Sequence, residues 1–185
     1  YWGPPVLGGT PQPPLNVSLG PFTNVSSLQF SFDSRKPTFV YGYVMETAID
    51  PYLPMPILTI GSTRSPQLAA RPALSPSQLT NLAIKKNLWQ DQGMDPIKSQ
   101  ATAQGMTDLS ADAVVTATGE LDAVHYGGVL TAPGLVGVRG AGANYDGLYY
   151  VKQVQHRITA KTGAFGYRQS FTLTREGLGS TVDQL

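Results

Sequence analysis

The stretch that most constrains the fold is residues 145–179, because it contains two consecutive runs with strand-like alternation. The first run, residues 148–159, is dense in aromatic and β-branched side chains, which favour strands. In the second run, residues 167–176, apolar and polar residues alternate with a period of two. That period is typical of a strand with one buried and one wet face, so Phe171 and Leu173 are expected to be buried. The short glycine-bearing loop between the runs predicts an antiparallel hairpin.

Two sets of residues in this hairpin are expected to be structural. The side chains expected to contribute to packing are Tyr149, Val151, Val154, His156, Tyr167, Phe171 and Leu173. The residues expected in turns, where glycine tolerates positive φ, are Asp146, Gly147, Gly163 and Gly166. The opposite face of the second run, formed by Arg168, Ser170, Thr172, Thr174 and Glu176, is expected to be wet.

The first part of the chain is expected to be a connector followed by strands. Residues 1–14 are rich in proline and glycine, which predicts an extended connector rather than a regular element. Within it, Trp2 is expected to anchor the connector to a neighbouring surface. Alternation of apolar residues then predicts short N-terminal strands within residues 15–49.

Residues 50–110 are expected to be a loop with a helical insertion. Proline interrupts the first part, so only a short strand at residues 57–60 is expected there. A helix is expected over residues 77–89, and a second helix from the N-cap pair Asp95 and Pro96 to about Gly105.

Residues 111–180 are expected to form a C-terminal β-sheet, and residues 181–185 a tail. The strands expected before the hairpin are residues 114–122, 129–131 and 135–139, with glycine and proline between them. Residues 15–180 are therefore predicted to form one mainly β (β-rich α+β) domain: an antiparallel barrel or sandwich with one or two short helices.

Charge limits the function classes. Lys and Arg number 13 against 12 Asp and Glu, so the net charge of +1 excludes nucleic-acid binding by bulk charge and no specific nucleic-acid partner is expected. Charged residues are only 14% of the chain, against about 25% in a typical soluble domain. This depletion favours a surface covered by other subunits. The alternative is a loop-rich domain solvated by Ser, Thr, Gln and Asn.

Three further features bear on the setting of the protein. Cysteine is absent, which rules out disulfides and thiolate chemistry. No run of ~18 apolar residues occurs, so no membrane span is expected. Because the chain begins at Tyr1 rather than Met, it is expected to be the later part of a longer protein.

No residue set in the sequence carries recognisable catalytic, cofactor or metal chemistry. His125 and His156 lack HExxH spacing, and a lone histidine on an apolar strand face is usually hydrogen-bonded in a structural role. Glu120 and Asp122 share a strand face, but a polar face or a subunit contact explains them better than acid–base work. The glycines at residues 137–142 match no phosphate-binding motif. The chain is therefore expected not to be an enzyme and to need no cofactor.

A spaced set of residues runs through both strands of the hairpin. It consists of Gly147, Tyr149, Val151, Val154, His156, Gly166, Tyr167, Phe171, Leu173, Arg175, Glu176 and Gly177. This pattern resembles the C-terminal end of the phage late control protein D family, the baseplate hub proteins of contractile tails and related injection systems. The likeness extends upstream through residues 114–123 and 135–140, and covers residues 98–180.

The resemblance implies a structural role and a set of partners. Hub proteins of this family form homotrimers whose β-barrels build a pseudo-sixfold ring, and they join the inner tube protein to the central spike protein among other baseplate proteins. It also implies assembly in the bacterial cytoplasm as part of a phage tail or injection particle, and another domain before this chain. In the family, the residue matching His156 has a recurring structural position.

Two other function classes remain open. A carbohydrate- or peptide-binding β-sandwich is the main alternative, because Trp2, Trp89 and nine tyrosines could supply stacking surfaces. A monomer with an exposed aromatic groove would favour that class, and a ring of copies would favour the hub. A hydrolase is the third class.

Overall fold

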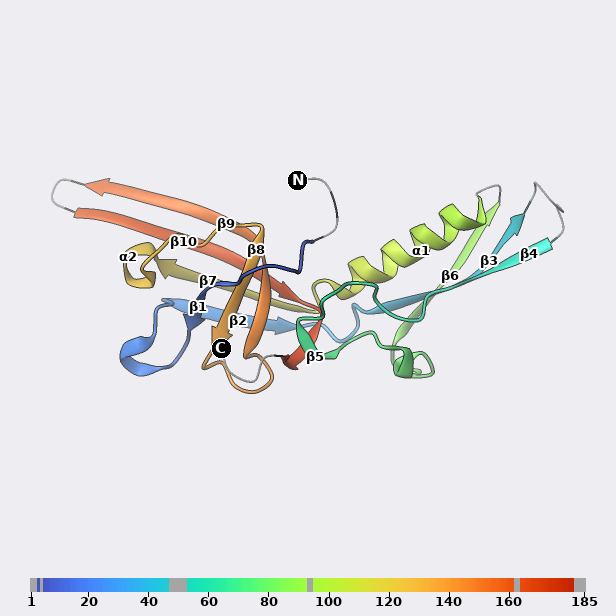
Figure 1. Ribbon diagram of the computed structural model, residues 1–185, viewed down its shortest axis with the longest axis horizontal. Coiled ribbons are helices and arrows are strands. Elements are labelled where there is room, and N and C mark those ends of the chain that lie inside the picture. The colour runs from blue at the N-terminus through green and yellow to red at the C-terminus, as the bar shows by residue number, and fades with distance from the viewer. Residues whose placement is uncertain (1–2, 4, 47–52, 93–94, 162–163, 182–185) are drawn as a thin grey trace. The chain divides into compact units, whose positions relative to one another are not determined.

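The computed structural model describes residues 3, 5–46, 53–92, 95–161 and 164–181 (Figure 1). Strands dominate, and the prediction of a mainly β fold with one or two short helices is confirmed. The chain divides into two compact units rather than one continuous domain. The first unit comprises residues 1–32, 65–71 and 115–185, and the second comprises residues 33–64 and 72–114. Trp2 and Gly163 lie outside the described residues.

The first unit is built on a six-stranded sheet with the order β1-β8-β9-β10-β7-β2. Its strands are β1 (Gln12–Asn16), β2 (Ser27–Phe32), β7 (Val115–Asp122), β8 (Gly134–Arg139), β9 (Gly147–Lys161) and β10 (Ala164–Arg175). The short helix α2 (Ala123–Tyr126) follows β7, and a 3₁₀ turn (Gly20–Phe22) follows β1. A separate pair joins β11 (Gly177–Ser180) to β5 (Ala69–Pro72).

The predicted hairpin is confirmed as the antiparallel pair β9–β10. Its register shifts between Thr172 and Leu173, where Thr172 lies opposite Gln153 and Leu173 lies opposite Val151. Lys152 is therefore the extra residue of a β-bulge, which reverses the side-chain alternation of β9. This reversal explains why Val151 and Val154, three residues apart, both contact the main core cluster.

The main sheet is open and mixed, which corrects the barrel and the purely antiparallel pairing named in the prediction. No closed barrel occurs among the described residues. β1 pairs with β8 in parallel, so the sheet is not purely antiparallel. Pro13 and Pro14 belong to β1, and Leu7 is buried, so residues 1–14 are not only a connector. The side chain of Leu15 is fully buried in the main core cluster, and this burial fixes β1 against the core.

The expected strand at residues 129–131 is wrong, because side-chain amides take the place of a strand partner. Gln169, fully buried, accepts from Leu130 N (3.0 Å) and donates to Leu130 O (2.8 Å). The Gln12 side chain does the same for Thr131, with 2.8 Å to its N and 2.9 Å to its O. The buried backbone groups of Leu130 need partners, which Gln169 supplies, and Gln12 does the same for the exposed Thr131.

The second unit is a three-stranded sheet with the order β4-β3-β6 and one long helix. Its elements are β3 (Thr38–Glu46), β4 (Leu53–Leu58), β6 (Lys85–Gln92) and α1 (Pro96–Ala111), with a 3₁₀ turn (Pro76–Gln78) before β6. Helix α1 packs on one face of the sheet through Ala103, which contacts Val40, Val44 and Ile57. None of the described helices is long and apolar enough to cross a membrane.

One of the two helices expected in this unit is confirmed and one is wrong. The Asp95 carboxylate caps α1 by accepting from Ile97 N (2.8 Å) and Lys98 N (3.3 Å). Residues 77–89, in contrast, form a 3₁₀ turn and then β6, which pairs in parallel with β3. The end of this segment is a strand because it pairs with β3, which is distant in the sequence, and the local sequence gives no sign of such pairing.

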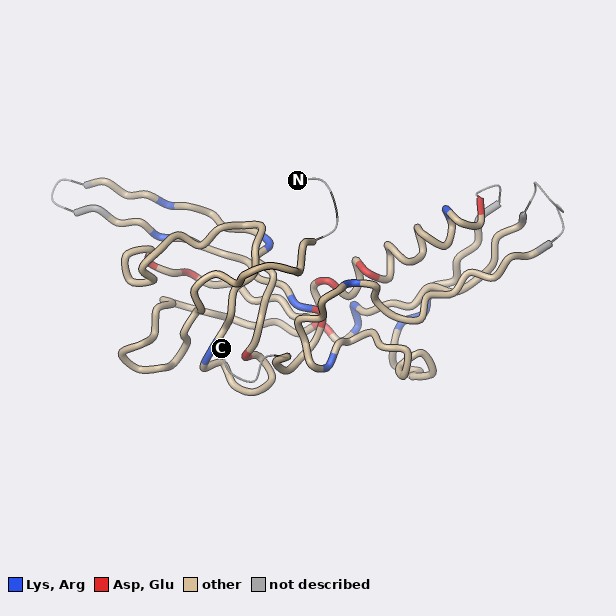
Figure 2. The backbone as a smooth tube through the Cα atoms, in the orientation of Figure 1, with Lys and Arg blue, Asp and Glu red and all other residues tan. Residues whose placement is uncertain are grey.

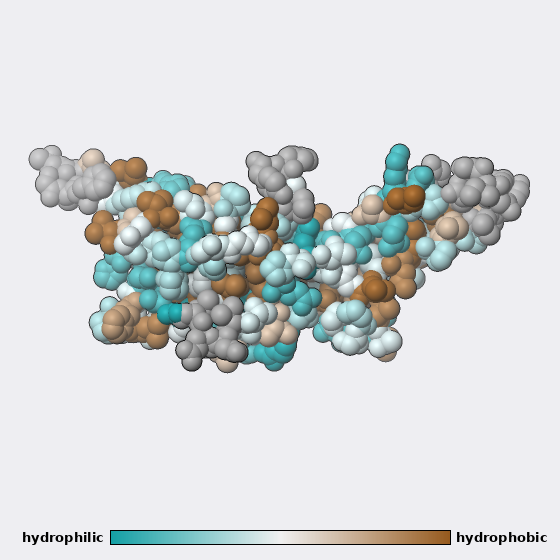
Figure 3. All heavy atoms as spheres, viewed as in Figure 1, coloured by the Kyte–Doolittle hydropathy of each residue, from teal (hydrophilic) through white to brown (hydrophobic). Residues whose placement is uncertain are grey.

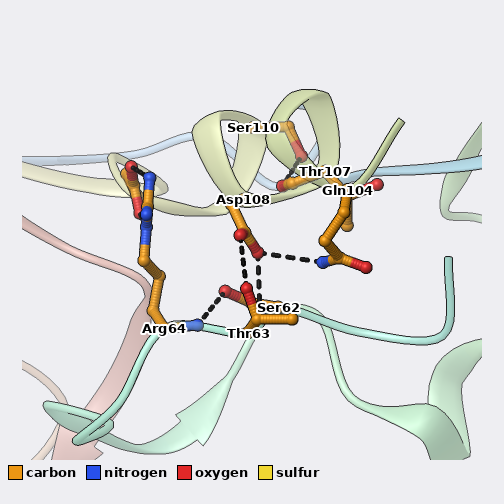
Figure 4. A network of polar contacts seen from close by, with 8 residues as sticks. Ser62, Thr63, Arg64, Gln104, Thr107, Asp108 and Ser110 are labelled. Atoms are coloured by element: carbon orange, nitrogen blue, oxygen red, sulfur yellow. Dashed lines mark hydrogen bonds and ion pairs between the residues drawn. The ribbon is translucent and has the colours of Figure 1, made fainter. Parts of the chain in front are cut away.

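A polar network fixes the loop after β4 to helix α1 (Figure 4). The buried Asp108 carboxylate accepts from Thr63 N (2.8 Å), Thr63 Oγ1 (2.6 Å) and Gln104 Nε2 (3.1 Å). One helical turn later, Asp112 forms a bidentate ion pair with Arg64 at 2.8 Å. The network is confined to the second unit. It provides hydrogen-bond partners for Asp108 and Asp112, the charged side chains at the end of α1 that face the loop.

Candidate assembly interface

The residues of the hairpin motif pack in the first unit rather than line a chemical site. Tyr149, Val151, Phe171 and Leu173 are buried in the main core cluster. Tyr149 is fully buried and donates its hydroxyl to Tyr145 O at 2.7 Å. Burial also raises the pKa of Tyr149 well above the ordinary tyrosine range. These residues form the rigid base from which the outer part of the hairpin extends.

Arg175 joins the two ends of the motif. Its guanidinium lies 4.3 Å from the centre of the Tyr149 ring, a cation–π contact. Its three nitrogens donate to the carbonyl oxygens of Gly177 (2.9 Å), Asp146 (2.9 Å) and Asn144 (2.7 Å). Burial lowers the pKa of Arg175, and nearby groups oppose that shift. This buried cation was not among the side chains expected to pack.

Gly147 and Glu176 complete this cluster. Gly147 has φ +129°, and a Cβ there would lie 2.8 Å from Arg175 Nη1, so only glycine fits. Glu176 is buried, and its Oε1 accepts from the backbone N–H of Leu68 and Ala69. Arg175 and Glu176 thus hold two separate chain segments in place, so these motif residues serve packing.

Other expectations for the hairpin need correction. His156 is exposed rather than in the core, because β9 runs past the rest of its unit at that point. Gly166 lies inside β10 opposite Thr159, not in a turn. Thr174 and Glu176 are buried although they were expected on a wet face, because the chain there packs under the segment that contains Leu68.

His156 instead takes part in a small polar cluster at the edge of the core. Its Nδ1 lies 2.8 Å from Tyr167 Oη and 3.2 Å from Gln169 Nε2. Tyr167 and Gln169 thus hold the imidazole of His156 through the same ring nitrogen. The imidazole and the half-buried Tyr167 ring are stacked, with centroids 6.0 Å apart. Gln169 was missed in the sequence because a buried amide in a polar run carries no signal.

The remaining chemical candidates have structural partners. His125 lies in α2, where its Nε2 is 3.1 Å from Thr23 O. Asp122 caps α2 by accepting from Val124 N at 2.9 Å, and Glu120 accepts from Ser170 Oγ at 3.3 Å. No cluster of three or more potential metal ligands occurs in the described part of the chain.

The outer edge of β1 is closed to further strand pairing. Pro13 and Pro14 have no N–H to offer. Their carbonyl oxygens accept from Tyr126 Oη (2.6 Å) and Asn24 Nδ2 (3.0 Å), and Asn16 N donates to Asn24 Oδ1 (2.7 Å). Exposed edges invite pairing with other chains, and this one is blocked.

The outer edge of β4, in the second unit, is closed in the same way. Pro54 and Pro56 lie two residues apart and remove two donors from the same edge. At the next residue on that edge, Gln100 accepts from Leu58 N (3.4 Å) and donates to Leu58 O (3.1 Å). Gln100 thus occupies both backbone groups of Leu58, and residues 54, 56 and 58 offer no free N–H donor on this edge.

Three other stretches of strand are open. β2 and β6 each end a sheet, and within the described residues no hydrogen bond reaches their outer edges. β9 is paired with β8 only from Gly147 to Val151, so residues 152–161 have no strand partner on that side among the residues that the structure describes. Each unit therefore has one closed sheet edge and one open edge, and the first unit also has the open stretch of β9.

A shallow polar hollow of about 440 Å³ lies on the sheet face across β2, β7, β10 and β9. Uncharged side chains line most of it, among them Gln29, Thr118, Gln153, Gln155 and Thr172. This is the wet face predicted for Ser170 and Thr172, although both are half-buried. The hollow is open and contains Glu120 as its ionisable residue.

The second unit exposes an apolar sheet face opposite α1. Tyr41 (43% exposed), Tyr43 (46%) and Leu88 (54%) point away from the helix, since Val40 and Val44 point toward it. In Figure 3, hydrophobic residues in brown lie among hydrophilic ones over both units, so apolar side chains reach the surface at several points. Scattered apolar residues are normal at a protein surface, whereas an adjacent group such as Tyr41, Tyr43 and Leu88 is typical of a surface that contacts another molecule.

Comparisons with known proteins support the fold. No protein-family model matches the sequence, and no curated protein is significantly similar to it. The fold is similar to that of the tail protein from Neisseria meningitidis MC58 (TM-score 0.58, 14% identity), over 95% of this chain and 47% of that one. It is also similar to the 43 kDa tail protein of prophage MuSo2 from Shewanella oneidensis (TM-score 0.54, 12% identity), over 88% of this chain and 43% of that one.

At these identities the likeness is one of fold. The chain spans less than half the length of either tail protein. The likeness is to tail proteins in general and does not single out the late control protein D family.

Proposed function

We propose that this chain is a structural component of a phage tail or a related contractile injection particle. The observation that carries the proposal is the fold shared with two tail proteins over nearly the whole chain. The open edges of β2, β6 and β9 and the low content of charged residues fit a protein that is surrounded by neighbours.

Within such a particle, we infer the position of the baseplate hub, between the inner tube and the central spike. The hairpin motif supports this position, because it resembles the hub family and its residues serve packing. The partners are then other copies of the chain, in a homotrimer, together with the tube, spike and other baseplate proteins. The protein assembles in the bacterial cytoplasm and acts without catalysis.

Deletion of the gene tests the tail role. In a strain that produces the particle, we expect loss of complete tails by electron microscopy, and recovery when the wild-type gene is supplied from a plasmid. Complete, infective or contractile particles in normal number without the gene would contradict the proposal.

A histidine double variant tests the absence of catalysis. His125→Gln with His156→Gln should restore tails as the wild type does, because glutamine retains a hydrogen-bonding group at both positions. Assembled particles that lack an activity present in the wild type would indicate an enzyme instead.

The second candidate, a carbohydrate- or peptide-binding module, is favoured by one observation. Tyr41 and Tyr43 form an exposed aromatic pair on the apolar sheet face, as stacking on a sugar or peptide requires. Trp89 cannot serve there, because it packs with the cluster under α1. A glycan or peptide that binds saturably to the wild type and not to Tyr41→Ala would support this function over the tail role.

A further inference from the structure

The open part of β9 is a prepared site for an additional strand. From residue 152 to residue 161, β9 pairs with β10 on one side and with nothing described on the other. We call this the free edge of β9. In Figure 1 the hairpin β9–β10 runs beyond the other strands of its unit. Alternate residues of such an edge present N–H and C=O groups in a regular row, which can be paired by an extended chain.

The charges on this hairpin are of one sign. From residue 147 to residue 175 the sequence contains lysine, arginine and histidine but no aspartate or glutamate. Figure 2 shows the same pattern, with blue and no red along the described length of β9 and β10. Lys152 and Arg157 are exposed, and no described carboxylate lies within ion-pair distance of either.

One row of side chains across the sheet shows where a negative charge is missing. Arg157 lies directly opposite Arg168, and Arg168 lies directly opposite Asp122 on β7. Like charges facing each other across strands are unfavourable. The Asp122 carboxylate is engaged at the start of α2. A carboxylate on an added strand, opposite Arg157, would place an acidic residue at each end of the row.

We propose that the free edge of β9 binds an extended acidic segment of another protein as an additional β-strand. Backbone pairing supplies the register, and Lys152 and Arg157 select the acidic side chains. The inference does not rest on the tail role. A second copy of this chain is a poor occupant, because its own open strands are uncharged in β2 and begin with two lysines in β6.

Nucleic acid is the competing polyanion, and the edge fits it less well. Single-stranded nucleic acid is held by aromatic side chains on which bases stack. The face of the free edge that carries Arg157 also carries Gln153, Gln155 and Thr159, none of them aromatic. On the opposite face the exposed aromatic side chain is His156, and its ring is already stacked on Tyr167. An extended polypeptide, in contrast, can form backbone hydrogen bonds with the unpaired N–H and C=O groups of this edge.

The test uses the full chain and a probe peptide of alternating threonine and glutamate, as long as the free edge. Binding is followed by fluorescence anisotropy of the labelled peptide and by amide hydrogen exchange of residues 152–161. We expect slowed exchange at the alternate amides that face away from β10, and no binding of a matched peptide with lysine in place of glutamate. Arg157→Glu should weaken binding by about tenfold or more.

Lys98→Glu is the matched control, because Lys98 is an exposed lysine at the start of α1. It should bind the peptide as the wild type does. The thermal unfolding temperature of Arg157→Glu should be no lower than that of the wild type, since the change relieves the repulsion between Arg157 and Arg168. Arg157→Gln serves as a milder second variant. The proposal is overturned by peptide binding without amide protection, by equal weakening in Lys98→Glu, by tighter binding of single-stranded DNA than of the peptide, or by no binding.

Discussion

Arg175 offers the sharpest test at the scale of a single residue, because one buried side chain satisfies three carbonyl oxygens. Arg175→Lys keeps the charge but cannot reproduce the planar fork, so carbonyl groups lose their donors. We expect the free energy of unfolding to fall by about 3 kcal/mol, measured by urea denaturation. The exposed Arg168→Lys is the control and should change little. Equal effects of the two substitutions would mean that the guanidinium does not hold the motif together.

Asp108 should make the second unit sensitive to acid. Burial favours the neutral form of this carboxyl, but hydrogen bonds from Thr63, Gln104 and Ser62 outweigh burial and lower the pKa below its ordinary 3.8. A group whose pKa is lowered in the folded state contributes stability above its unfolded pKa and loses it as pH falls through the folded pKa.

Asp108→Asn isolates this contribution. The variant should be less stable than the wild type near pH 7, because an amide cannot accept from all three donors. The difference in the free energy of unfolding should shrink as pH falls below about 4. A difference that stays constant down to strongly acidic pH would show that the charge of Asp108 does not stabilise the fold.

At the scale of elements, the register of β10 is tested by two neighbouring residues. Phe171 is buried and Thr172 half-buried. Phe171→Ala should therefore lower stability by about 3–5 kcal/mol through lost burial and a cavity. Thr172→Ala should cost much less. Thermal or urea unfolding of the two variants measures both losses of stability. Losses of similar size would mean that the strand register is wrong by one residue.

Elements with a local signal could be predicted from sequence. The alternation at Phe171 and Leu173 identified β10, and the capping pair Asp95 and Pro96 identified the start of α1. The spacing of Val151 and Val154 contained the signal of a β-bulge, because two core residues of a regular strand lie an even number apart.

Elements that depend on distant partners could not be predicted. β6 is a strand because it pairs in parallel with β3, and residues 129–131 are not a strand because Gln12 and Gln169 occupy their backbone groups. Neither relation leaves a periodic pattern in the local sequence. The same holds for the open and closed sheet edges, since Gln100 closes β4 from a different element.

At the scale of the whole molecule, the isolated chain is not expected to be a stable monomer. It leaves open strand edges at β2 and β6 and exposes Tyr41, Tyr43 and Leu88. We expect self-association or aggregation in sedimentation velocity, and burial of more than ~800 Å² per partner in the native assembly. A monodisperse monomer with saturable affinity for a small molecule would favour the binding-module alternative.

The most direct test of the tail role is a cryo-electron microscopy map of the native particle from the phage or bacterium that encodes this chain. We expect the six-stranded sheet and the α1-covered sheet to fit density between the inner tube and the central spike, in several symmetry-related copies. Density for the chain elsewhere in the tail would contradict the hub position alone. A complete particle without the chain would contradict the structural role itself.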